Sequence, residues 1–240
     1  MRNIGIPRRS YRAGIGILGV LLTALPMTDV AAQTPGLPVL QGPFITPGRG
    51  LGVNYGDGDA FSAIALAASW TPAANRFQVS GGLSGVSPDG ASGHGVGVGA
   101  RVAVPVRTRW TDSTSALGAA VFGGVGGAWW SGAGELRVPV GVSLAYRMRL
   151  GETRVVAAYL APYFQWSRRT GDRDAALVAA AEDEGDDRQD SDLARAAVGV
   201  EVTITRGVSL SLGYDLGEDA EGGRPGPTSG IVGVGIGWRF

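Results

Sequence analysis

Few side chains in this sequence are of the types that carry out catalysis. The chain has a single histidine, His94, and no cysteine, so thiol chemistry, disulfides and cysteine-based metal sites are excluded. Hydrolysis by a serine nucleophile needs a base within hydrogen-bond reach, and the sequence has no G-x-S-x-G motif. His94 lies in the glycine-rich stretch 88–95, which favours an incidental loop residue over a base or a metal ligand.

Carboxylates are the other groups that could do acid–base chemistry. Within the strands predicted below, only Glu201 and Asp215 carry one. An acidic protease needs two carboxylates that converge, and pairing of each acid with a nearby arginine is the favoured interpretation here. We therefore expect no enzyme activity, no metal and no cofactor.

A second group of acids gathers in the segment 168–192. Its members are Asp172, Asp174, Glu182, Asp183, Glu184, Asp186, Asp187, Asp190 and Asp192. Such a cluster could collect Ca²⁺ or Mg²⁺, including ions that bridge lipopolysaccharide phosphates. The segment lacks the D-x-[DN]-x-[DN]-G spacing of a calcium loop, so a solvated surface loop is the favoured interpretation.

Arginine supplies all 21 basic residues of the chain. The arginines are dispersed, which indicates a bias in genomic base composition rather than phosphate recognition and predicts no nucleic-acid partner. Several of them fall on one face of the predicted strands, together with tyrosine, glutamine and the two carboxylates. We predict that this face lines the lumen of a barrel through Arg76, Arg101, Arg137, Arg147, Arg149, Arg195, Arg239, Glu201, Asp215, Tyr159, Tyr163 and Gln165.

The elements that must position these residues are β-strands. The last stretch, Gly230–Phe240, alternates large apolar residues with glycine and Arg239. A period of two predicts a strand with one apolar face and one small or polar face. The same alternation recurs upstream and predicts ten strands, at 50–56, 60–70, 76–86, 95–106, 116–130, 136–149, 153–167, 193–205, 208–216 and 231–240.

Two features of this strand assignment leave alternatives open. Eight strands are the alternative to ten. The first predicted strand is short and could belong to the lead-in, which would leave an odd number, whereas an even number is expected for an antiparallel up-and-down barrel. Pro162 falls inside the seventh predicted strand, where its missing N–H breaks the ladder unless a bulge is present.

The polar faces decide between a soluble and a membrane barrel. A soluble barrel turns its large apolar residues inward and its charged residues outward. Here the face opposite the aliphatic one is mostly Gly, Ala and Ser, and glycine makes up 41 of 240 residues, against a usual share of about 7%. We predict an all-β, transmembrane, antiparallel up-and-down barrel whose aliphatic faces meet lipid. A soluble β-sandwich or a lipocalin-like barrel is the alternative.

The end of the chain carries a family resemblance. The pattern Gly235-x-x-Trp238-x-Phe240 resembles the C-terminal strand of bacterial outer-membrane β-barrels, which ends in an aromatic residue and is read during assembly. Together with the alternating strands, residues 49–240 resemble the small OmpA-like and OmpW-like barrels. The resemblance implies three partners: outer-membrane lipids, lipopolysaccharide and the outer-membrane assembly machinery. We expect no peptidoglycan-binding domain, and the sequence leaves the oligomeric state open.

Connections and aromatic residues fit this resemblance. If Phe240 ends at the periplasmic rim, the long segments 168–192 and 217–229 are external, the tight turns near 150–152 and 206–207 are periplasmic, and 107–115 is a longer periplasmic exception. Aromatic residues then form girdles at both membrane interfaces. The predicted girdle residues are Trp129, Trp130, Phe164, Trp166 and Tyr214 on the external side, and Trp70, Phe77, Trp238 and Phe240 on the periplasmic side.

The N-terminus predicts export to a Gram-negative outer membrane. Four arginines precede the apolar run 13–25 and small residues at 30–32, as in a cleaved signal peptide over 1–32. A Pro/Gly-rich lead-in, 33–48, then precedes the barrel, 49–240. The segment 1–32 holds four of the 21 basic and one of the 21 acidic residues, so the mature chain has 17 basic and 20 acidic residues.

Two functions follow from the predicted barrel. Seven inward arginines against two acids leave a surplus of charge that water must solvate. The first hypothesis is therefore a narrow, mildly anion-preferring passive channel for ions or small solutes. Barrels of about eight strands have just enough interior for their own side chains. The alternative is thus a closed structural or adhesive barrel that acts through its external loops, notably the acidic loop 168–192.

Overall fold

The computed structural model describes residues 44–58, 61–88, 94–130, 133–171, 188–205, 207–217 and 231–240. The predicted signal peptide, most of the predicted lead-in and the centre of the acidic segment 168–192 lie outside the described residues. Within the described ranges, no helix is long and apolar enough to cross a membrane.

Ten strands make up the regular structure of these residues. They are β1 (Gly48–Asp57), β2 (Phe61–Thr71), β3 (Gln78–Pro88), β4 (Gly95–Trp110), β5 (Ser115–Trp130), β6 (Ala133–Arg149), β7 (Val155–Gly171), β8 (Arg188–Thr205), β9 (Val208–Gly217) and β10 (Ile231–Arg239). The prediction of ten strands is confirmed, and the alternative of eight is wrong.

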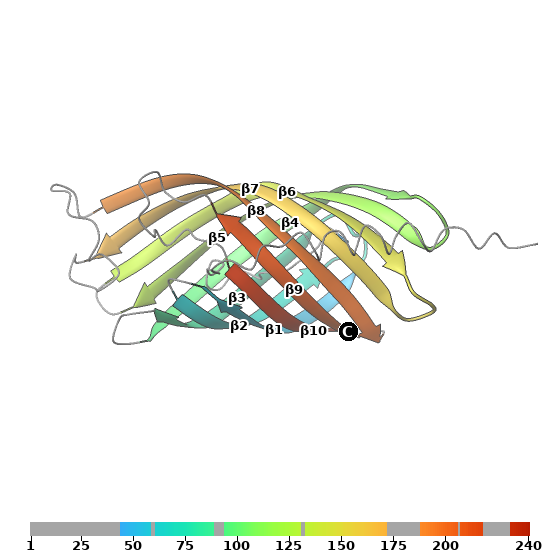
Figure 1. Ribbon diagram of the computed structural model, residues 1–240, viewed down its shortest axis with the longest axis horizontal. Coiled ribbons are helices and arrows are strands. Elements are labelled where there is room, and N and C mark those ends of the chain that lie inside the picture. The colour runs from blue at the N-terminus through green and yellow to red at the C-terminus, as the bar shows by residue number, and fades with distance from the viewer. Residues whose placement is uncertain are drawn as a thin grey trace, which may run out of the picture.

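The strands close into one antiparallel barrel. Each strand pairs with its neighbours in the sequence, and β1 pairs with β10 from Gly50–Arg239 to Asp57–Val232. Figure 1 shows the strands running obliquely around the barrel, as closure requires. This up-and-down topology confirms the predicted fold class.

The two ends of the barrel hold different connections. The turn end contains the connections 72–77, 111–114 and 150–154, together with Gly207, the start of β1 and Phe240. The opposite end, here called the loop end, receives the connections that begin after β1, β3, β5, β7 and β9. The turn end is the side that the sequence predicts to be periplasmic.

The outer surface of the barrel is apolar on every strand. Each of the ten strands carries a large exposed hydrophobic residue, of which Leu83 on β3 is 65% exposed and Val140 on β6 is 58% exposed. Alanines and serines on the opposite face are buried, among them Ala116, Ala120 and Ser143. A soluble protein does not expose a continuous apolar surface of this kind, so this surface fits a hydrocarbon environment.

Prolines in the wall coincide with defects in the strand ladders. The pairing of β4 with β5 shifts register between Pro105 and Arg107. Around Pro162, the pairing of β6 with β7 passes from Gly141–Tyr163 to Leu144–Leu160 with the intervening pairs missing and the register unchanged. A proline cannot donate to the ladder. The predicted break at Pro162 is therefore present, without a register-shifting bulge.

The connection between β4 and β5 differs from the sequence prediction. Beyond the irregularity at Pro105, β4 continues to Trp110, so the predicted long segment 107–115 is a turn of four residues, 111–114. Asp112 stabilises this turn, since its Oδ1 accepts hydrogen bonds from Thr114 N, Thr114 Oγ1 and Ser115 N at 2.7–2.8 Å.

Candidate functional site: the barrel interior

The interior of the barrel has two unlike walls. On β1, β2, β3 and β10 the inward positions are mostly glycine, alanine and serine, such as Gly52, Ala65 and Ser80. Most of the long polar and aromatic side chains come from β4 to β9, and Asn54, Gln78 and Arg239 are exceptions on the first wall. The pairing registers align the inward positions of neighbouring strands, so the long side chains meet one another rather than the small-residue wall.

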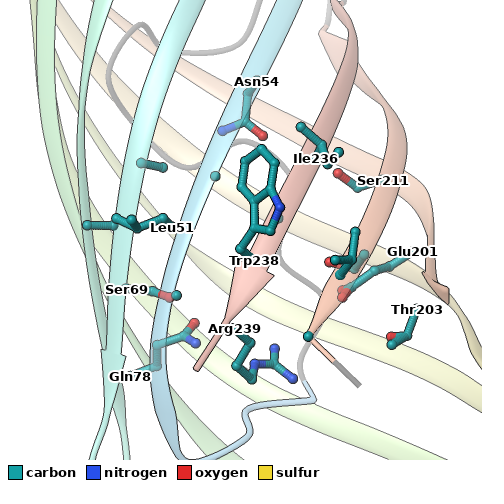
Figure 2. A pocket seen from close by; sticks show the side chains of 18 of the residues that line it. Leu51, Asn54, Ser69, Gln78, Glu201, Thr203, Ser211, Ile236, Trp238 and Arg239 are labelled. Carbon is teal, nitrogen blue, oxygen red and sulfur yellow. The ribbon is translucent and has the colours of Figure 1, made fainter. Parts of the chain in front are cut away.

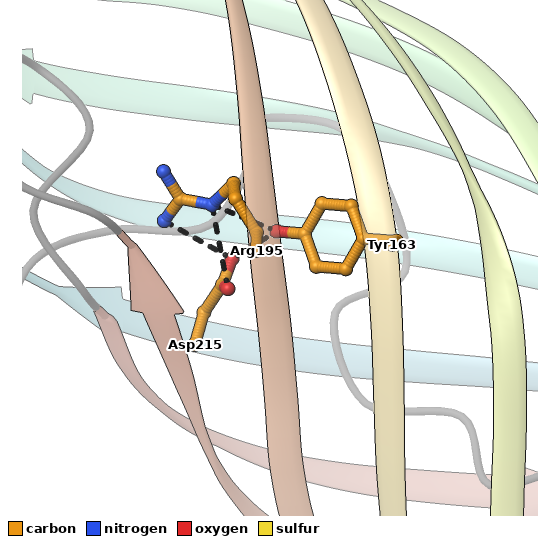
Figure 3. A network of polar contacts seen from close by, with 3 residues as sticks. All are labelled: Tyr163, Arg195 and Asp215. Atoms are coloured by element: carbon orange, nitrogen blue, oxygen red, sulfur yellow. Dashed lines mark hydrogen bonds and ion pairs between the residues drawn. The ribbon is translucent and has the colours of Figure 1, made fainter.

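A three-residue polar network crosses β7, β8 and β9 (Figure 3). Tyr163 pairs directly with Arg195, and Ala197 on β8 pairs with Asp215. Arg195 Nε donates to Tyr163 Oη at 3.0 Å, and Tyr163 Oη donates to Asp215 Oδ2 at 2.5 Å. Arg195 Nη2 also lies 3.4 Å from Asp215 Oδ2, and both charged residues are buried. The network holds a buried ion pair with a shared hydroxyl partner.

A second buried ion pair lies on β6. Arg137 Nη2 donates to Glu135 Oε2 at 2.7 Å, and both side chains are buried. The predicted strand 136–149 leaves out Glu135, but β6 begins at Ala133 and so includes it. The alternation Glu135, Arg137, Pro139 continues the inward face upstream of Leu136. That period-two signal could have identified Glu135 as an inward acid.

Arg101 occupies a different environment from these two arginines. Its guanidinium lies over the Phe122 ring, 4.1 Å from the centroid. No described carboxylate forms an ion pair with it, and its Nε is shielded from solvent without a hydrogen-bond partner. Tyr159 Oη and Gln165 Oε1 are likewise buried and have no partner within the described part of the chain. Buried polar atoms normally have a partner, so this interior is suited to water or a polar solute.

Three more predicted lumenal arginines lie toward the turn end. Arg147 is partly buried, with its guanidinium 4.6 Å from the Phe44 ring centroid and 4.9 Å from that of Trp110. Arg149 is exposed at the rim of β6. Arg76 lies in the exposed turn 72–77, because β3 begins only at Gln78. The predicted wall position of Arg76 is therefore corrected to a turn.

A polar pocket lies against the small-residue wall near the turn end (Figure 2). It has a volume of about 110 Å³ and draws its lining from β1, β2, β3, β8, β9 and β10, as well as from Phe44. Gln78 and Arg239 lie toward one end of the pocket and Asn54 toward the other, and Glu201 on β8 also lines it. Glycines at 50, 52 and 237 leave this space open.

The predicted girdle residues divide into two groups. Trp70, Trp129, Phe164, Trp238 and Phe240 are exposed on the outer face, and Trp166 and Tyr214 are partly buried on the same face. Phe77 lies in the turn 72–77, edge-on to Trp70 with 5.8 Å between ring centroids.

Trp130 departs from the predicted girdle. It packs against the buried cluster of Val86, Ala128 and Ile231, inside the barrel toward the loop end. Consecutive residues of a strand face opposite sides, so Trp129 and Trp130 cannot both face lipid. The prediction for Trp130 is wrong for this reason.

The histidine lies near the loop end, away from the buried networks. Ser87 Oγ and His94 Nδ1 form an exposed hydrogen bond of 3.1 Å. Within the described ranges no carboxylate bonds to this imidazole, and no group of three or more potential metal ligands is found. The orienting third group of a nucleophilic triad is thus missing among these residues.

A closed antiparallel barrel with an apolar outer face and a charged, hydrogen-bonded interior defines a transmembrane β-barrel. More narrowly, the chain belongs to the outer membrane protein beta-barrel domain family, which it matches over residues 60–240. Among proteins with curated descriptions, no sequence matches this chain.

Solved structures share the fold at low sequence identity. The KdgM porin is 12% identical with a TM-score of 0.32, covering 80% of this chain and 99% of the porin chain. The outer membrane enzyme PagL is 14% identical with a TM-score of 0.37, covering 80% of this chain and 98% of the enzyme chain.

Proposed function

We propose that the protein is a narrow, mildly anion-preferring passive channel for ions or small solutes across the outer membrane. The balance of charge on the inner face carries this proposal. Among the described side chains, six arginines face the interior or its rim, against three acids. The arginines are Arg101, Arg137, Arg147, Arg149, Arg195 and Arg239, and the acids are Glu135, Glu201 and Asp215.

Pairing leaves this positive excess in place. Arg137 and Arg195 each have a carboxylate partner, whereas Arg101 and Arg147 lie over aromatic rings, which leave their charge uncompensated. A fixed positive charge lining a low-dielectric passage lowers the barrier for anions and raises it for cations. The excess therefore favours anions.

The asymmetry of the walls supports a passage through the barrel. A ten-stranded barrel is only slightly wider than one filled by its own side chains. Here most of the long side chains come from one wall, and the opposite wall is mostly glycine, alanine and serine. The polar pocket of Figure 2 lies on this second wall, and it supports a route beside the small residues.

A selectivity measurement tests the proposal. Folded protein, verified by heat-modifiable gel mobility, is inserted into a planar bilayer under a salt gradient. We expect discrete conductance steps whose reversal potential favours the anion. Arg101→Glu should shift that potential toward cation preference. The control is Arg154→Glu, the same change of charge in the exposed turn 150–154, which should leave it unshifted. A silent folded barrel, or equal shifts in both variants, would overturn the proposal.

The alternative function, a closed structural or adhesive barrel that acts through its external loops, remains a prediction. Its main element, the acidic loop 168–192, has its centre outside the described residues. Deleting most of 170–190 should then leave folding intact and abolish a surface interaction. A silent bilayer with a folded protein would favour this second function over the channel.

A further inference from the structure

The residues just before β1 enter the barrel instead of leaving it. The Phe44 ring packs against Ala145 and Tyr159, which are buried on the inner faces of β6 and β7. In the closed ring of ten strands, β6 is five strands away from β1 in either direction, the largest separation possible. The chain that enters β1 at Gly48 therefore carries Phe44 across the lumen to the opposite wall.

The opposite wall has a position that fits this ring. On β5, a Cβ atom at Gly118 would lie 2.6 Å from Phe44 Cε1, so only glycine leaves room for the ring there. The Arg147 guanidinium stacks over the ring at 4.6 Å and also over Trp110 at 4.9 Å. Phe44 is thus held by contacts from three strands. Gly118 on β5 leaves space for the ring, Arg147 on β6 stacks over it, and Ala145 on β6 and Tyr159 on β7 pack against it.

Phe44 also borders the open side of the lumen. It lines the polar pocket, whose other lining residues come from β1, β2, β3, β8, β9 and β10. The ring contacts β5, β6 and β7 on its other side. Phe44 therefore stands between the two walls at the turn end, where a solute on the small-residue wall must pass it.

We infer that Phe44 is the size-determining residue of the channel, a stopper that is carried into the lumen by the segment 44–47 and seated on Gly118 and Arg147. The inference rests on the proposed channel function, since a stopper matters only where something passes. It differs from a role in packing alone, because a packing residue would change the stability of the barrel and leave its conductance unaltered.

The position of the segment can be tested without any conductance. The natural chain has no cysteine, so a single introduced thiol reports on one site. The Phe44→Cys variant should react with a polyethylene-glycol maleimide about tenfold or more slowly than Ser113→Cys, an exposed position in a turn at the same end. Both variants should react equally fast after denaturation. Equal rates in the folded proteins would overturn the inferred position.

Two substitutions test the stopper in the planar bilayer. Phe44→Ala removes the ring, and Gly118→Ala displaces it by steric conflict. Each should raise the single-channel conductance, Phe44→Ala by about twofold, as expected for widening a narrow pore. The matched control is Gly123→Ala on the same strand, where the nearest atoms to a Cβ lie 3.8 Å away and no change is expected. Gel mobility verifies the fold of each variant.

The outcomes separate this inference from the proposed function. If the natural protein conducts and Phe44→Ala leaves its conductance unchanged, the stopper is overturned and the channel proposal is unaffected. A natural protein that is silent and a Phe44→Ala variant that conducts overturn the passive channel of the natural protein and support a stopper that closes the lumen. Silence of both folded proteins overturns the channel and the stopper together.

Discussion

At the residue scale, the network of Arg195, Asp215 and Tyr163 illustrates how the interior tolerates charge. The ion pair is buried, and the tyrosine hydroxyl bonds to both partners. Removing one member of such a pair leaves a charge that has lost both water and its counterion. The network therefore acts as a unit, and its parts cannot be deleted independently.

We expect Asp215→Ala to lower the free energy of unfolding by about 3 kcal/mol, because it leaves Arg195 buried without its carboxylate. Urea titration of the refolded barrel, followed by tryptophan fluorescence, measures the loss. Asp215→Asn keeps an acceptor for the Tyr163 hydroxyl and should lose less. Equal stability of Asp215→Ala and the natural protein would show that Arg195 is already solvated.

The turn 111–114 gives a prediction outside the membrane-spanning strands. Hydrogen bonds from the backbone and side chain of Thr114, and from Ser115, lower the pKa of Asp112 below its usual value. A carboxyl whose pKa is lowered by folding contributes stability above its unfolded pKa and loses it as the pH falls through the folded pKa. Asp112→Ala should therefore destabilise the barrel at neutral pH and become equivalent to the natural protein in strong acid.

Thermal unfolding in detergent, repeated across the acid range, measures this difference. Ser113→Ala is the control, because Ser113 is exposed in the same turn and forms none of these three bonds. A destabilisation by Asp112→Ala that persists unchanged in strong acid would show that the ionised carboxylate is not its cause.

At the scale of the element, the β6–β7 pair leaves no room for a side chain at Gly141. A Cβ atom at Gly141 would lie 2.5 Å from Pro162 O and would also meet Tyr163 Cβ. The backbone cannot move away, because Gly141 and Tyr163 are paired in the ladder beside the gap at Pro162. Glycine at this position therefore permits the close approach that brings Tyr163 to Arg195.

Gly141→Ala should accordingly cost about 2 kcal/mol of stability and lower the refolding yield, because overpacking against backbone has no inexpensive relaxation. Gel mobility and urea titration measure both quantities. In the control, Gly85→Ala on β3, a Cβ meets nothing within 4 Å and should change neither. Similar losses in the two variants would mean that the steric conflict at Gly141 is not the cause, since a loss of chain entropy on replacing glycine would stabilise both.

The strands themselves were largely predictable, and their ends were not. A strict period of two identifies inward and outward faces within a strand such as β6, because alternation is a local property of extended backbone. Strand ends depend on which neighbour continues to pair. For that reason the sequence predicts Arg76 inside a strand and Glu135 outside one, although the structure shows the reverse. Both residues lie within a few residues of a strand end.

The candidate site was predictable as a face but not as a set of contacts. The alternation of side chains assigns Arg101, Arg137, Arg195 and Asp215 to the interior, whereas the pairing of Arg195 with Asp215 depends on a register between strands that the sequence does not encode locally. Phe44 carried no sequence signal, because the Pro/Gly-rich segment around it has no period. Its seat on Gly118 depends on closure of the whole barrel.

At the scale of the whole molecule, closure joins the two ends of the described chain. Arg49 N donates to Phe240 O and Phe240 N donates to Arg49 O, each at 3.0 Å, and Arg239 N donates to Gly207 O at 2.8 Å. All three bonds use only backbone atoms. The Phe240 side chain is 70% exposed on the outer face. Closing the barrel therefore does not need an aromatic ring at position 240.

The side chains of the final strand should therefore matter for assembly in the cell, whereas its backbone hydrogen bonds close the barrel. We expect Phe240→Ala to refold in detergent or lipid with stability within about 0.5 kcal/mol of the natural protein, as for other exposed positions. In a Gram-negative host, the same variant should reach the outer membrane in severalfold lower amount if, as the resemblance implies, the assembly machinery reads the terminal aromatic residue. Phe164→Ala, which removes a 50% exposed ring from β7, should leave both quantities unchanged. Equal membrane levels of the two variants would refute the assembly role, and a matching loss of stability in vitro would make the ring structural.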